Sequence, residues 1–369
     1  MEILIVLILF STLVYCANIL YLVFGFFKIK SFTINEIDPQ TRFTIIVPFR
    51  NEAQNLPKLL HSISLLDYPK DLFEVILVDD ESSEKFQIPK VNFQIQTINN
   101  KRISNSPKKD AINTAINIAN FEWIITTDAD CIVQPKWLKT FDNFIQSENP
   151  KMIAAGVFYA TDNSFLQAFQ QLDLLSLQGT TIGSFGNKNA FMCNGANFCY
   201  QKLFFHELNG FNGNANIASG DDVFLLQKAI LKNKKNVHFL KCETALVKTK
   251  PENSWKNLFF QRVRWASKTG NYSNLYSKQL GISVLLFNGI VILLLLLFIL
   301  GLVDFSFFVI IFSVKFLVDY LLLLKTSSFF KTKLHYLLLG SLLYPIFSFC
   351  VGIYSIFGGY SWKGRYFKK

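Results

Sequence analysis

The sequence is short of charged residues, which make up only 17% of the chain against about 25% in an ordinary soluble domain. Hydrophobic residues make up 51%, and 39 of the 369 residues are Phe. This composition excludes a disordered chain, a collagen-like fibre and an ordinary cytosolic enzyme.

Metal-binding and disulfide patterns are also missing. The chain has six Cys and four scattered His, and no C-x-x-C occurs. Cys16 and Cys350 lie inside apolar stretches. We therefore expect reduced cysteines that fill space in a protein facing the cytoplasm, and no zinc site.

Acidic residues are outnumbered by basic ones, 26 to 37, which gives a net charge of +11. No basic block is interleaved with aromatic residues along one face, so the excess charge predicts no nucleic-acid partner. Long apolar runs with basic flanks instead indicate a membrane protein.

The first apolar run covers residues 3–27, enough to cross about 30 Å of hydrocarbon as a helix. It starts after Glu2, ends before Lys28 and Lys30, and contains no small-residue cleavage site. It predicts an anchor over 1–27. Because basic flanks stay in the cytoplasm, we expect the chain from residue 28 onward inside and the N-terminus outside.

The second apolar block predicts membrane helices over 281–302 and 305–324, followed by a basic loop. A third stretch, 334–357, is ambiguous. If it spans, the tail from Lys363 to Lys369 lies outside, against the positive-inside rule, whereas a re-entrant or interfacial segment avoids the conflict.

Two charged residues fall inside the second of these helices. Lys315 and Asp319 are four residues apart and therefore share a helix face. They can pair within the bundle or mark an ion pathway.

Between the apolar blocks the sequence has ordinary polarity and a strand–turn–helix pattern. Runs of β-branched and apolar residues typical of buried strands predict a parallel α/β sheet. The predicted strands are 42–49, 73–78, 93–97 and 123–127, and the predicted helices are 53–66 and 107–119. The resulting division is an anchor over 1–27, an α/β domain over 28–250, an interfacial segment over 251–278, and two or three membrane helices over 279–369.

Paired carboxylates follow two of these strands. Asp79 and Asp80 close one, and Asp128 and Asp130 close another. Ligands of open α/β sheets bind beyond the carboxyl ends of the strands. Such pooled negative charge predicts a divalent cation, Mg²⁺ or Mn²⁺, which would bridge the phosphates of a substrate.

Two further segments carry candidate chemistry. Asp221 and Asp222 precede a helix over 223–231, where one carboxylate can cap the helix and the other can act as a general base. Gln261, Arg264 and Trp265 share one face of a helical segment. That helix can simply lie at the lipid headgroups, or its Arg can grip a diphosphate while its Trp presents an apolar platform.

Together these motifs resemble those of family 2 glycosyltransferases, the GT-A-fold group that includes cellulose and hyaluronan synthases and ceramide glucosyltransferases. The resemblance covers about residues 42–268, with five motifs in the family's order. It implies a GT-A domain, a Rossmann-like open and mostly parallel sheet, combined with transmembrane helices.

The resemblance also assigns roles on the donor side. Glu52 lies in the opening segment IIVPFRNEAQNL, and Asp79 and Asp80 would read the nucleotide base and ribose, with Glu81 where the family has Gly. Lys108 would face the diphosphate. Asp128 and Asp130 match the D-x-D that holds the metal and diphosphate, with the direct metal contact at Asp130.

On the acceptor side, the segment Cys193, Asn194, Gly195 is similar to the family's acceptor site, to which Trp265 also contributes. Asp222, beside Asp221, would be the catalytic base. Gln261, Arg264 and Trp265 match Q-x-x-R-W and would also contact the donor.

The implied reaction is inverting transfer from a nucleotide-diphosphate sugar, with a UDP-sugar expected, to a hydroxyl of a lipid, lipid-linked or glycan acceptor. It would take place at the cytoplasmic face of a membrane, with a bacterial inner membrane expected. A processive polysaccharide synthase is one alternative, and a non-enzymatic membrane scaffold or transporter is another.

Overall fold

The computed structural model describes residues 2–83, 86–162, 164–362 and 365–367. Its internal contacts divide the chain into two units. We call Ile29–Ala160 with Ala190–Lys250 the sheet unit, and Met1–Lys28 with Thr161–Asn189 and Pro251–Lys369 the helical unit. Residues 161–189, inside the range 28–250 expected for the α/β domain, thus group with the helical unit.

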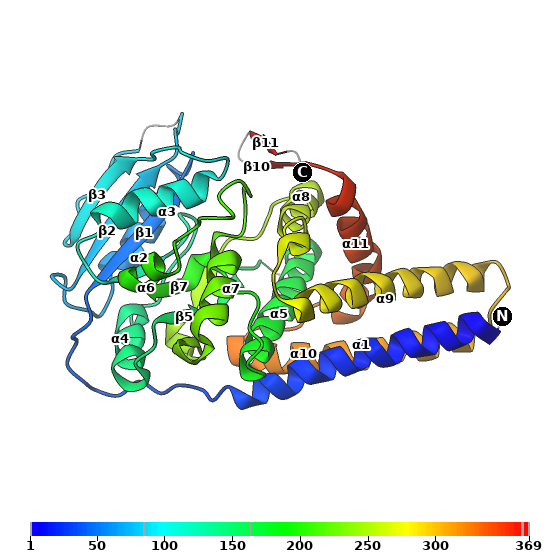
Figure 1. Ribbon diagram of the computed structural model, residues 1–369. Coiled ribbons are helices and arrows are strands. Elements are labelled where there is room, and N and C mark those ends of the chain that lie inside the picture. Colours follow the sequence, from blue (N-terminus) through cyan, green and yellow to red (C-terminus); the bar gives the residue numbers. More distant parts are fainter. Residues whose placement is uncertain (1, 84–85, 163, 363–364, 368–369) are drawn as a thin grey trace. The chain divides into compact units, whose positions relative to one another are not determined.

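The sheet unit is built on seven strands in the order β3-β2-β1-β4-β7-β5-β8 (Figure 1). All neighbours pair in parallel except β7, which is antiparallel to both β4 and β5. The strands are β1 (Phe43–Phe49), β2 (Phe73–Asp79), β3 (Gln94–Asn99), β4 (Trp123–Thr126), β5 (Met152–Ala155), β7 (Phe198–Gln201) and β8 (Val237–Leu240). A small parallel pair, β6 (Val157–Tyr159) and β9 (Val247–Thr249), completes the unit.

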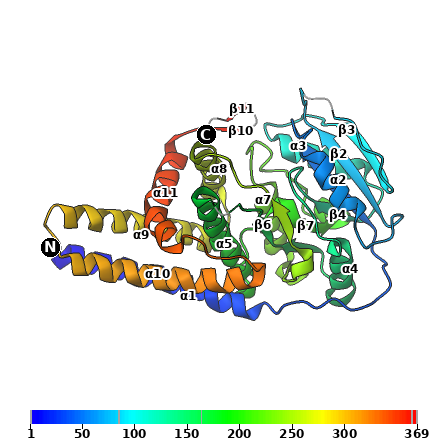
Figure 2. The same ribbon diagram turned by 180° about the vertical axis from the view of Figure 1, so that it is seen from behind.

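The central strands are mostly apolar because helices cover both faces of the sheet. In β1, Ile45, Ile46 and Val47 are all fully buried. Figures 1 and 2, seen from opposite sides, show α3 on one face and α2 on the other. The helices of this unit are α2 (Leu56–Ser64), α3 (Pro107–Ile118), α4 (Trp137–Glu148), α6 (Lys202–Glu207) and α7 (Asp221–Asn233), with short 3₁₀ turns at η1 (Gly195–Asn197), η2 (Lys234–Asn236) and η3 (Glu243–Ala245).

The helical unit contains the long apolar helices. Four helices in the described part of the chain are long and apolar enough to cross a membrane: α1 (Glu2–Lys28), α9 (Leu275–Ile299), α10 (Phe305–Phe330) and α11 (Leu337–Phe357). The unit also holds α5 (Phe165–Gly186), α8 (Trp255–Ala266), the 3₁₀ turn η4 (Thr269–Asn271) and the hairpin β10 (Tyr360–Trp362) with β11 (Arg365–Phe367).

Helices α1 and α5 touch through their backbones. A Cβ on Gly25 would lie 2.0 Å from the carbonyl oxygen of Gly183, and a Cβ on Gly186 would lie 1.8 Å from that of Gly25. No side chain fits at these distances, so glycine is required at the contact.

The two charged residues inside α10 contact each other and a residue of α1. The Lys315 ammonium lies 2.5 Å from the Asp319 carboxylate, which also accepts a hydrogen bond of 2.6 Å from the Tyr15 hydroxyl of α1. These are the contacts of a pair within the bundle, the first of the two roles considered for these residues.

Candidate active site

The register of the sheet places the ends of three strands at one edge. Phe49, the last residue of β1, pairs with Asp79 of β2, and Ile46 pairs with Thr126 at the end of β4. Asp80 directly follows β2, and Asp128 lies two residues beyond β4. The carboxylates predicted from the sequence therefore follow β2 and β4, the two strands that flank β1, at the carboxyl edge, where open α/β sheets bind ligands.

Asp80 is buried and contacts the Asn100 amide and the Arg102 guanidinium, two residues that no sequence motif had indicated. Its Oδ1 accepts a 2.7 Å hydrogen bond from Asn100, which follows β3, and lies 3.5 Å from the Arg102 guanidinium. Arg102 also lies 3.5 Å from Asp110. Part of the negative charge at this edge is thus balanced by the protein itself.

The turn after β2 keeps a glycine-like conformation without glycine. Glu81 has a φ of +59°, in the left-handed region that favours Gly. Arg50 donates to the carbonyl oxygens of Asp80 (2.6 Å) and Glu81 (2.8 Å), and Asp79 accepts from the Ser82 N–H (2.9 Å). These bonds fix the turn that carries the two aspartates.

Glu52 lies at the start of α2. Its carboxylate accepts a hydrogen bond of 2.5 Å from the Asn55 side chain, and its carbonyl oxygen accepts from the Asn55 N–H. The contacts described for Glu52 are therefore those that start the helix.

Lys108 joins the D-x-D segment to the proposed base segment. Its ammonium nitrogen lies 2.7 Å from Asp128 Oδ1 and 3.6 Å from Asp221 Oδ2. Burial alone would lower the pKa of Lys108, but the carboxylates of Asp128 and Asp221 outweigh burial and hold the pKa above its ordinary value. Lys108 is therefore a permanent positive charge at the centre of the site.

Asp222 points into the same cluster from the first turn of α7. Its Oδ2 accepts a 2.8 Å hydrogen bond from the Gly195 N–H, and its Oδ1 accepts from the Val223 N–H at 2.7 Å. A Cβ on Gly195 would lie 3.0 Å from Asp221 Oδ2 and 3.3 Å from the Lys108 nitrogen. The backbone at Gly195 thus lies directly against the Lys108 and aspartate groups.

Hydrogen bonds from β4 and within the turn fix the segment around Gly195. The Thr126 hydroxyl of β4 donates to the Gly195 carbonyl oxygen at 2.6 Å, and the Asn194 side chain accepts from the Ala196 N–H at 3.0 Å. Cys193 is a half-buried, reduced thiol. Of the predicted residues, the structure thus brings together Lys108, Asp128, Asp221, Asp222 and Gly195.

Comparison with known proteins agrees with this arrangement. The family model described as "Glycosyl transferase family 2" matches residues 44–208, which contain Asp79, Lys108 and Asp128. The matched segment is a glycosyl transferase family 2 domain.

Two curated proteins resemble parts of this chain. Poly(ribitol-phosphate) beta-N-acetylglucosaminyltransferase TarS of Staphylococcus aureus is 30% identical over 118 residues, 30% of this chain. Glycosyltransferase AglE of Haloferax volcanii is 24% identical over 127 residues, 32% of this chain. The matched regions span only 20% of TarS and 40% of AglE.

Among solved structures, mannosyltransferase PcManGT from Pyrobaculum calidifontis, in complex with GDP-Man and Mn²⁺, aligns with a TM-score of 0.51 and 14% identity. The alignment covers 96% of this chain and 97% of that one. This likeness concerns the fold alone. The prediction of a GT-A-type, mostly parallel α/β domain combined with long apolar helices is confirmed.

The donor set of the family 2 domain suits a loosely held Mg²⁺-type ion. Within the described residues, no group of three or more His, Cys, Asp or Glu side chains lies close enough to enclose a metal. Asp128 and Asp130 nonetheless offer hard carboxylate oxygens, and the Asp128 side chain is 40% exposed. Mg²⁺ is commonly bound by one or two carboxylates plus substrate phosphates, and this pair fits that mode.

The remaining predicted residues belong to the helical unit, on α8. The Gln261 side chain donates a 2.8 Å hydrogen bond to the Glu252 carboxylate, and its Oε1 accepts a hydrogen bond from Arg262. The guanidinium carbon of Arg262 lies 4.2 Å from the centre of the Trp265 ring. Arg264, the motif arginine, lies two residues further along the same helix.

Sequence reasoning missed two lysines that hold the loop before α7. Lys109 donates to the carbonyl oxygens of Asn214 (2.7 Å) and Ile217 (2.9 Å). Lys228 donates to those of Gly210 (2.7 Å) and Asn212 (2.6 Å). The only available signal was a Lys-Lys pair at the start of α3, and it does not show which lysine faces the loop.

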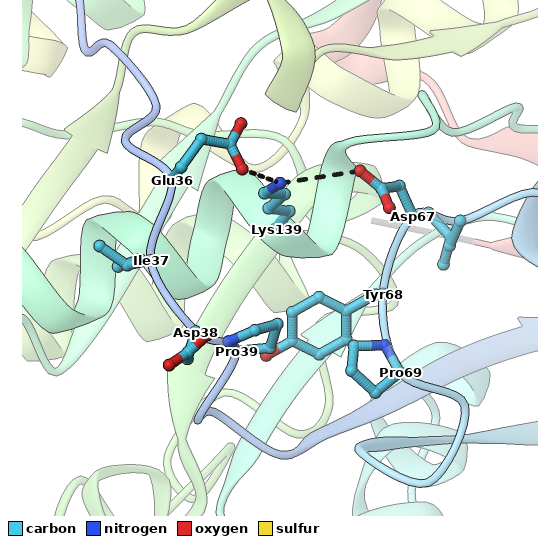
Figure 3. Close-up of a pocket in the computed structure, with 9 residues that line it drawn as sticks. Glu36, Ile37, Asp38, Pro39, Asp67, Tyr68, Pro69 and Lys139 are labelled. Atoms are coloured by element: carbon cyan, nitrogen blue, oxygen red, sulfur yellow. Dashed lines mark hydrogen bonds and ion pairs between the residues drawn. The ribbon is translucent and has the colours of Figure 1, made fainter.

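A hollow of about 500 Å³ lies at the other edge of the sheet (Figure 3). It is lined by residues that precede β1 and β2, among them Pro39 and Tyr68. Lys139 reaches Glu36 at 2.8 Å and Asp67 at 3.8 Å across it. Because ligands of such sheets bind at the carboxyl edge, this hollow is not the donor site of the family 2 domain.

Proposed function

We propose that this chain is a membrane-bound inverting glycosyltransferase. It moves a sugar from a nucleotide-diphosphate donor, with a UDP-sugar expected, to a hydroxyl of a lipid, lipid-linked or glycan acceptor at the cytoplasmic face. The observation that carries the proposal is Lys108, whose ammonium bridges Asp128 of the D-x-D and Asp221 of the base segment.

The chemistry requires one carboxylate that accepts a proton. Asp222 takes the proton of the acceptor hydroxyl, the acceptor oxygen forms a bond to the anomeric carbon, and the bond from that carbon to the diphosphate oxygen breaks. The nucleoside diphosphate leaves with the bonding electrons, and the configuration at the anomeric carbon inverts. No covalent sugar intermediate is involved, so a second carboxylate nucleophile is not needed.

The departing diphosphate gains negative charge, which the site can stabilise. Lys108 provides a fixed ammonium, and Arg264 is proposed to provide a guanidinium. A divalent cation held by Asp130 and Asp128 would supply additional charge neutralisation at the diphosphate. Asp79 and Asp80 are proposed to bind the nucleoside, with Asn100 and Arg102 keeping the Asp80 carboxylate in place.

Membrane attachment is supported by the four long apolar helices. The positive-inside rule places the sheet unit in the cytoplasm, with the membrane of a bacterial cell as the expected setting. Four candidate spans are few for a polymer channel within one chain, which favours an amphiphilic acceptor over a processive synthase. TarS, which resembles part of this chain, is a poly(ribitol-phosphate) beta-N-acetylglucosaminyltransferase, so a glycan acceptor remains the alternative.

The test uses detergent-purified protein, Mn²⁺ or Mg²⁺, and a panel of nucleotide sugars, with nucleoside diphosphate release followed with and without lipid extract. Release that needs metal and lipid, and that disappears in Asp130→Asn and Asp222→Asn, supports the proposal. Release without lipid and with a high-mass product favours a polysaccharide synthase instead. If no donor is consumed and no nucleotide binds, the enzyme proposal fails and a scaffold or transporter remains.

A further inference from the structure

Helix α11 is as apolar as a membrane span and contacts the apolar helix α9, but two of its other neighbours, α5 and α8, carry polar and charged residues. Its first half lies along α5: Tyr336 is 5.6 Å from Phe165 and Tyr344 is 6.4 Å from Phe169, between ring centres. A Cβ on Gly340 would lie 2.8 Å from Leu172 of the same helix. This part of α5 also carries Gln167, Gln170, Gln171 and Asp173.

The second half of α11 lies along α8. Phe347 is 6.2 Å from Phe259, and Tyr354 is 5.5 Å from Phe259 and 6.0 Å from Phe260. Val351 of α11 and Tyr360 of the hairpin that follows it pack with Val263 of α8 in one buried cluster. Helix α8 contains Lys256, Gln261, Arg262 and Arg264 within 12 residues.

A polar helix of 12 residues is only about 18 Å long, too short and too charged to cross the hydrocarbon layer. The chain also connects both polar helices directly to the sheet unit. Residues 160 and 190 flank the α5 segment, and only four residues separate Lys250 from Trp255. The two helices that border α11 along its length therefore belong to the catalytic side of the membrane.

The contact of α11 with α9 is a crossing. It involves Phe349 against Gly289, Gly352 against Leu285, and Ser348 with Asn288 at 3.2 Å. Leu285 is four residues, or about 6 Å, into the apolar run that begins at Gly281. Figures 1 and 2 both show α11 running across the common direction of α1, α9 and α10.

We propose that α11 does not span the membrane but lies within the leaflet on the catalytic side, and that the hairpin after it stays on that side. One face of α11 carries exposed apolar side chains, and this face contacts lipid acyl chains. Its residues are Leu338, Leu342, Ile346, Ile353 and Phe357. The chain then crosses the membrane three times, through α1, α9 and α10.

Charge agrees with this topology. Lys331 and Lys333 precede α11 and Arg365 follows it, so all three lie on the catalytic side, as the positive-inside rule requires. Lys363, Lys368 and Lys369 of the same tail lie outside the described residues. A spanning α11 would instead leave Arg365 on the far side, away from the hairpin contact with Val263.

The inference rests on the proposed membrane attachment but not on the proposed transfer reaction, so its test measures no turnover. An epitope tag with a protease site is appended after Lys369 of the full chain, in vesicles of known orientation. Matched tags are placed in the loop after Gly301, between α9 and α10, and beside Ser83 of the sheet unit. We expect the C-terminal tag to be cleaved from the same side as the Ser83 tag and from the side opposite to the Gly301 tag.

A second measurement gives the depth of α11. Spin labels are attached to single cysteines at positions 338, 342, 346 and 353, with Cys16, Cys193 and Cys350 replaced by Ser, and oxygen and nickel accessibility is compared. A span would change depth by about 22 Å over these 15 residues and pass through the bilayer centre. We expect all four labels in one leaflet, whereas labels at 282, 286, 293 and 299 on α9 should cross the centre.

Cleavage of the C-terminal tag from the side of the Gly301 tag, or a passage of the α11 labels through the bilayer centre, overturns the proposal. Absence of any membrane-depth signal in both series would overturn membrane attachment itself. Neither outcome depends on whether the chain transfers sugar, so the two proposals fail separately.

Discussion

Arg262 and Asp173 form a buried ion pair, with the guanidinium Nε 2.5 Å from the carboxylate. The same guanidinium stacks on Trp265 and donates to Gln261, two residues of the Q-x-x-R-W motif. Asp173 lies on α5 and Arg262 on α8. A residue between the motif positions therefore connects the motif to a second helix.

This contact predicts that Arg262 positions the motif side chains as well as joining two helices. Arg262→Lys keeps the charge but loses the planar group that stacks on the ring and reaches two partners. We expect kcat to fall roughly tenfold or more. We also expect the fluorescence emission of Trp265 to shift, where that emission is the difference between spectra recorded with Trp265 and with Trp265→Phe. The charge-swapped Asp173→Arg/Arg262→Asp variant can restore thermal stability but not the stack. Full activity in that swap would show that the pair is merely structural.

The contacts of Asp222 predict a loss of turnover without a loss of donor binding. Asp222→Asn keeps the shape but removes the proton acceptor, and a general base contributes roughly 10²–10⁴-fold. We therefore expect kcat to fall by that factor while calorimetry shows unchanged nucleotide affinity. Asp71→Asn, at an exposed carboxylate outside the site, is the matched control and should leave both quantities unchanged. A kcat within threefold of wild type in Asp222→Asn would assign the base elsewhere.

Gly195 tests how tightly the cluster is packed. In Gly195→Ala the new methyl group would approach Asp221 Oδ2 to 3.0 Å and the Lys108 nitrogen to 3.3 Å, so those groups must move. We expect kcat to fall roughly tenfold to a hundredfold with little change in the thermal midpoint. Gly270→Ala, where an added Cβ meets nothing within 4 Å, is the control and should have wild-type activity. Equal activity of the two variants would contradict the packing argument.

The central strands and their terminal carboxylates could be predicted because the signal is local. β1 and β2 are mostly apolar runs, typical of strands buried on both faces, and their ends differ from the prediction by only one residue. The helix after β2 and β3 was likewise predicted at Pro107, because Pro is favoured at the first turn of a helix.

Other features depend on contacts between distant segments and could not be predicted. β7 has four residues, and its antiparallel pairing with β4 joins positions about 75 residues apart. α5 carries buried Gln170 and Asp173, which interrupt the apolar pattern of a packed helix. Gln170 donates to the Glu252 carbonyl oxygen and Asp173 pairs with Arg262, both outside α5. Lys108 and Asp221 are likewise distant in sequence, so only the fold shows that they meet.

The raised pKa of Lys108 predicts donor binding that does not change with pH. The pKa of Lys108 in the folded protein lies above the ordinary pKa of lysine. Lys108 therefore stays charged at every pH below its raised pKa and loses its charge only as the pH rises above that raised pKa. We therefore expect a constant donor Kd between pH 6 and 9. In Lys108→His the charge is lost in that range because histidine titrates near pH 6.5, so donor affinity should fall about tenfold from pH 6 to 8. A wild-type Kd that weakens in parallel would contradict the assignment of the charge to Lys108.

The pair in α10 predicts a stability effect and no role in transport. In Lys315→Met, the partly buried Asp319 carboxylate keeps Tyr15 but loses its cation, and breaking a fully buried pair in this way costs about 3–5 kcal/mol, which is the upper limit of the expected loss. Replacing both residues, as in Lys315→Met/Asp319→Leu, removes the unpaired charge and should recover most of that loss, measured as thermal unfolding in detergent. An ion pathway makes the opposite prediction, because it needs both charges for function whatever the stability. A double variant that is stable but inactive would therefore favour the pathway, and one that is stable and active identifies a pair that only holds α10 against α1.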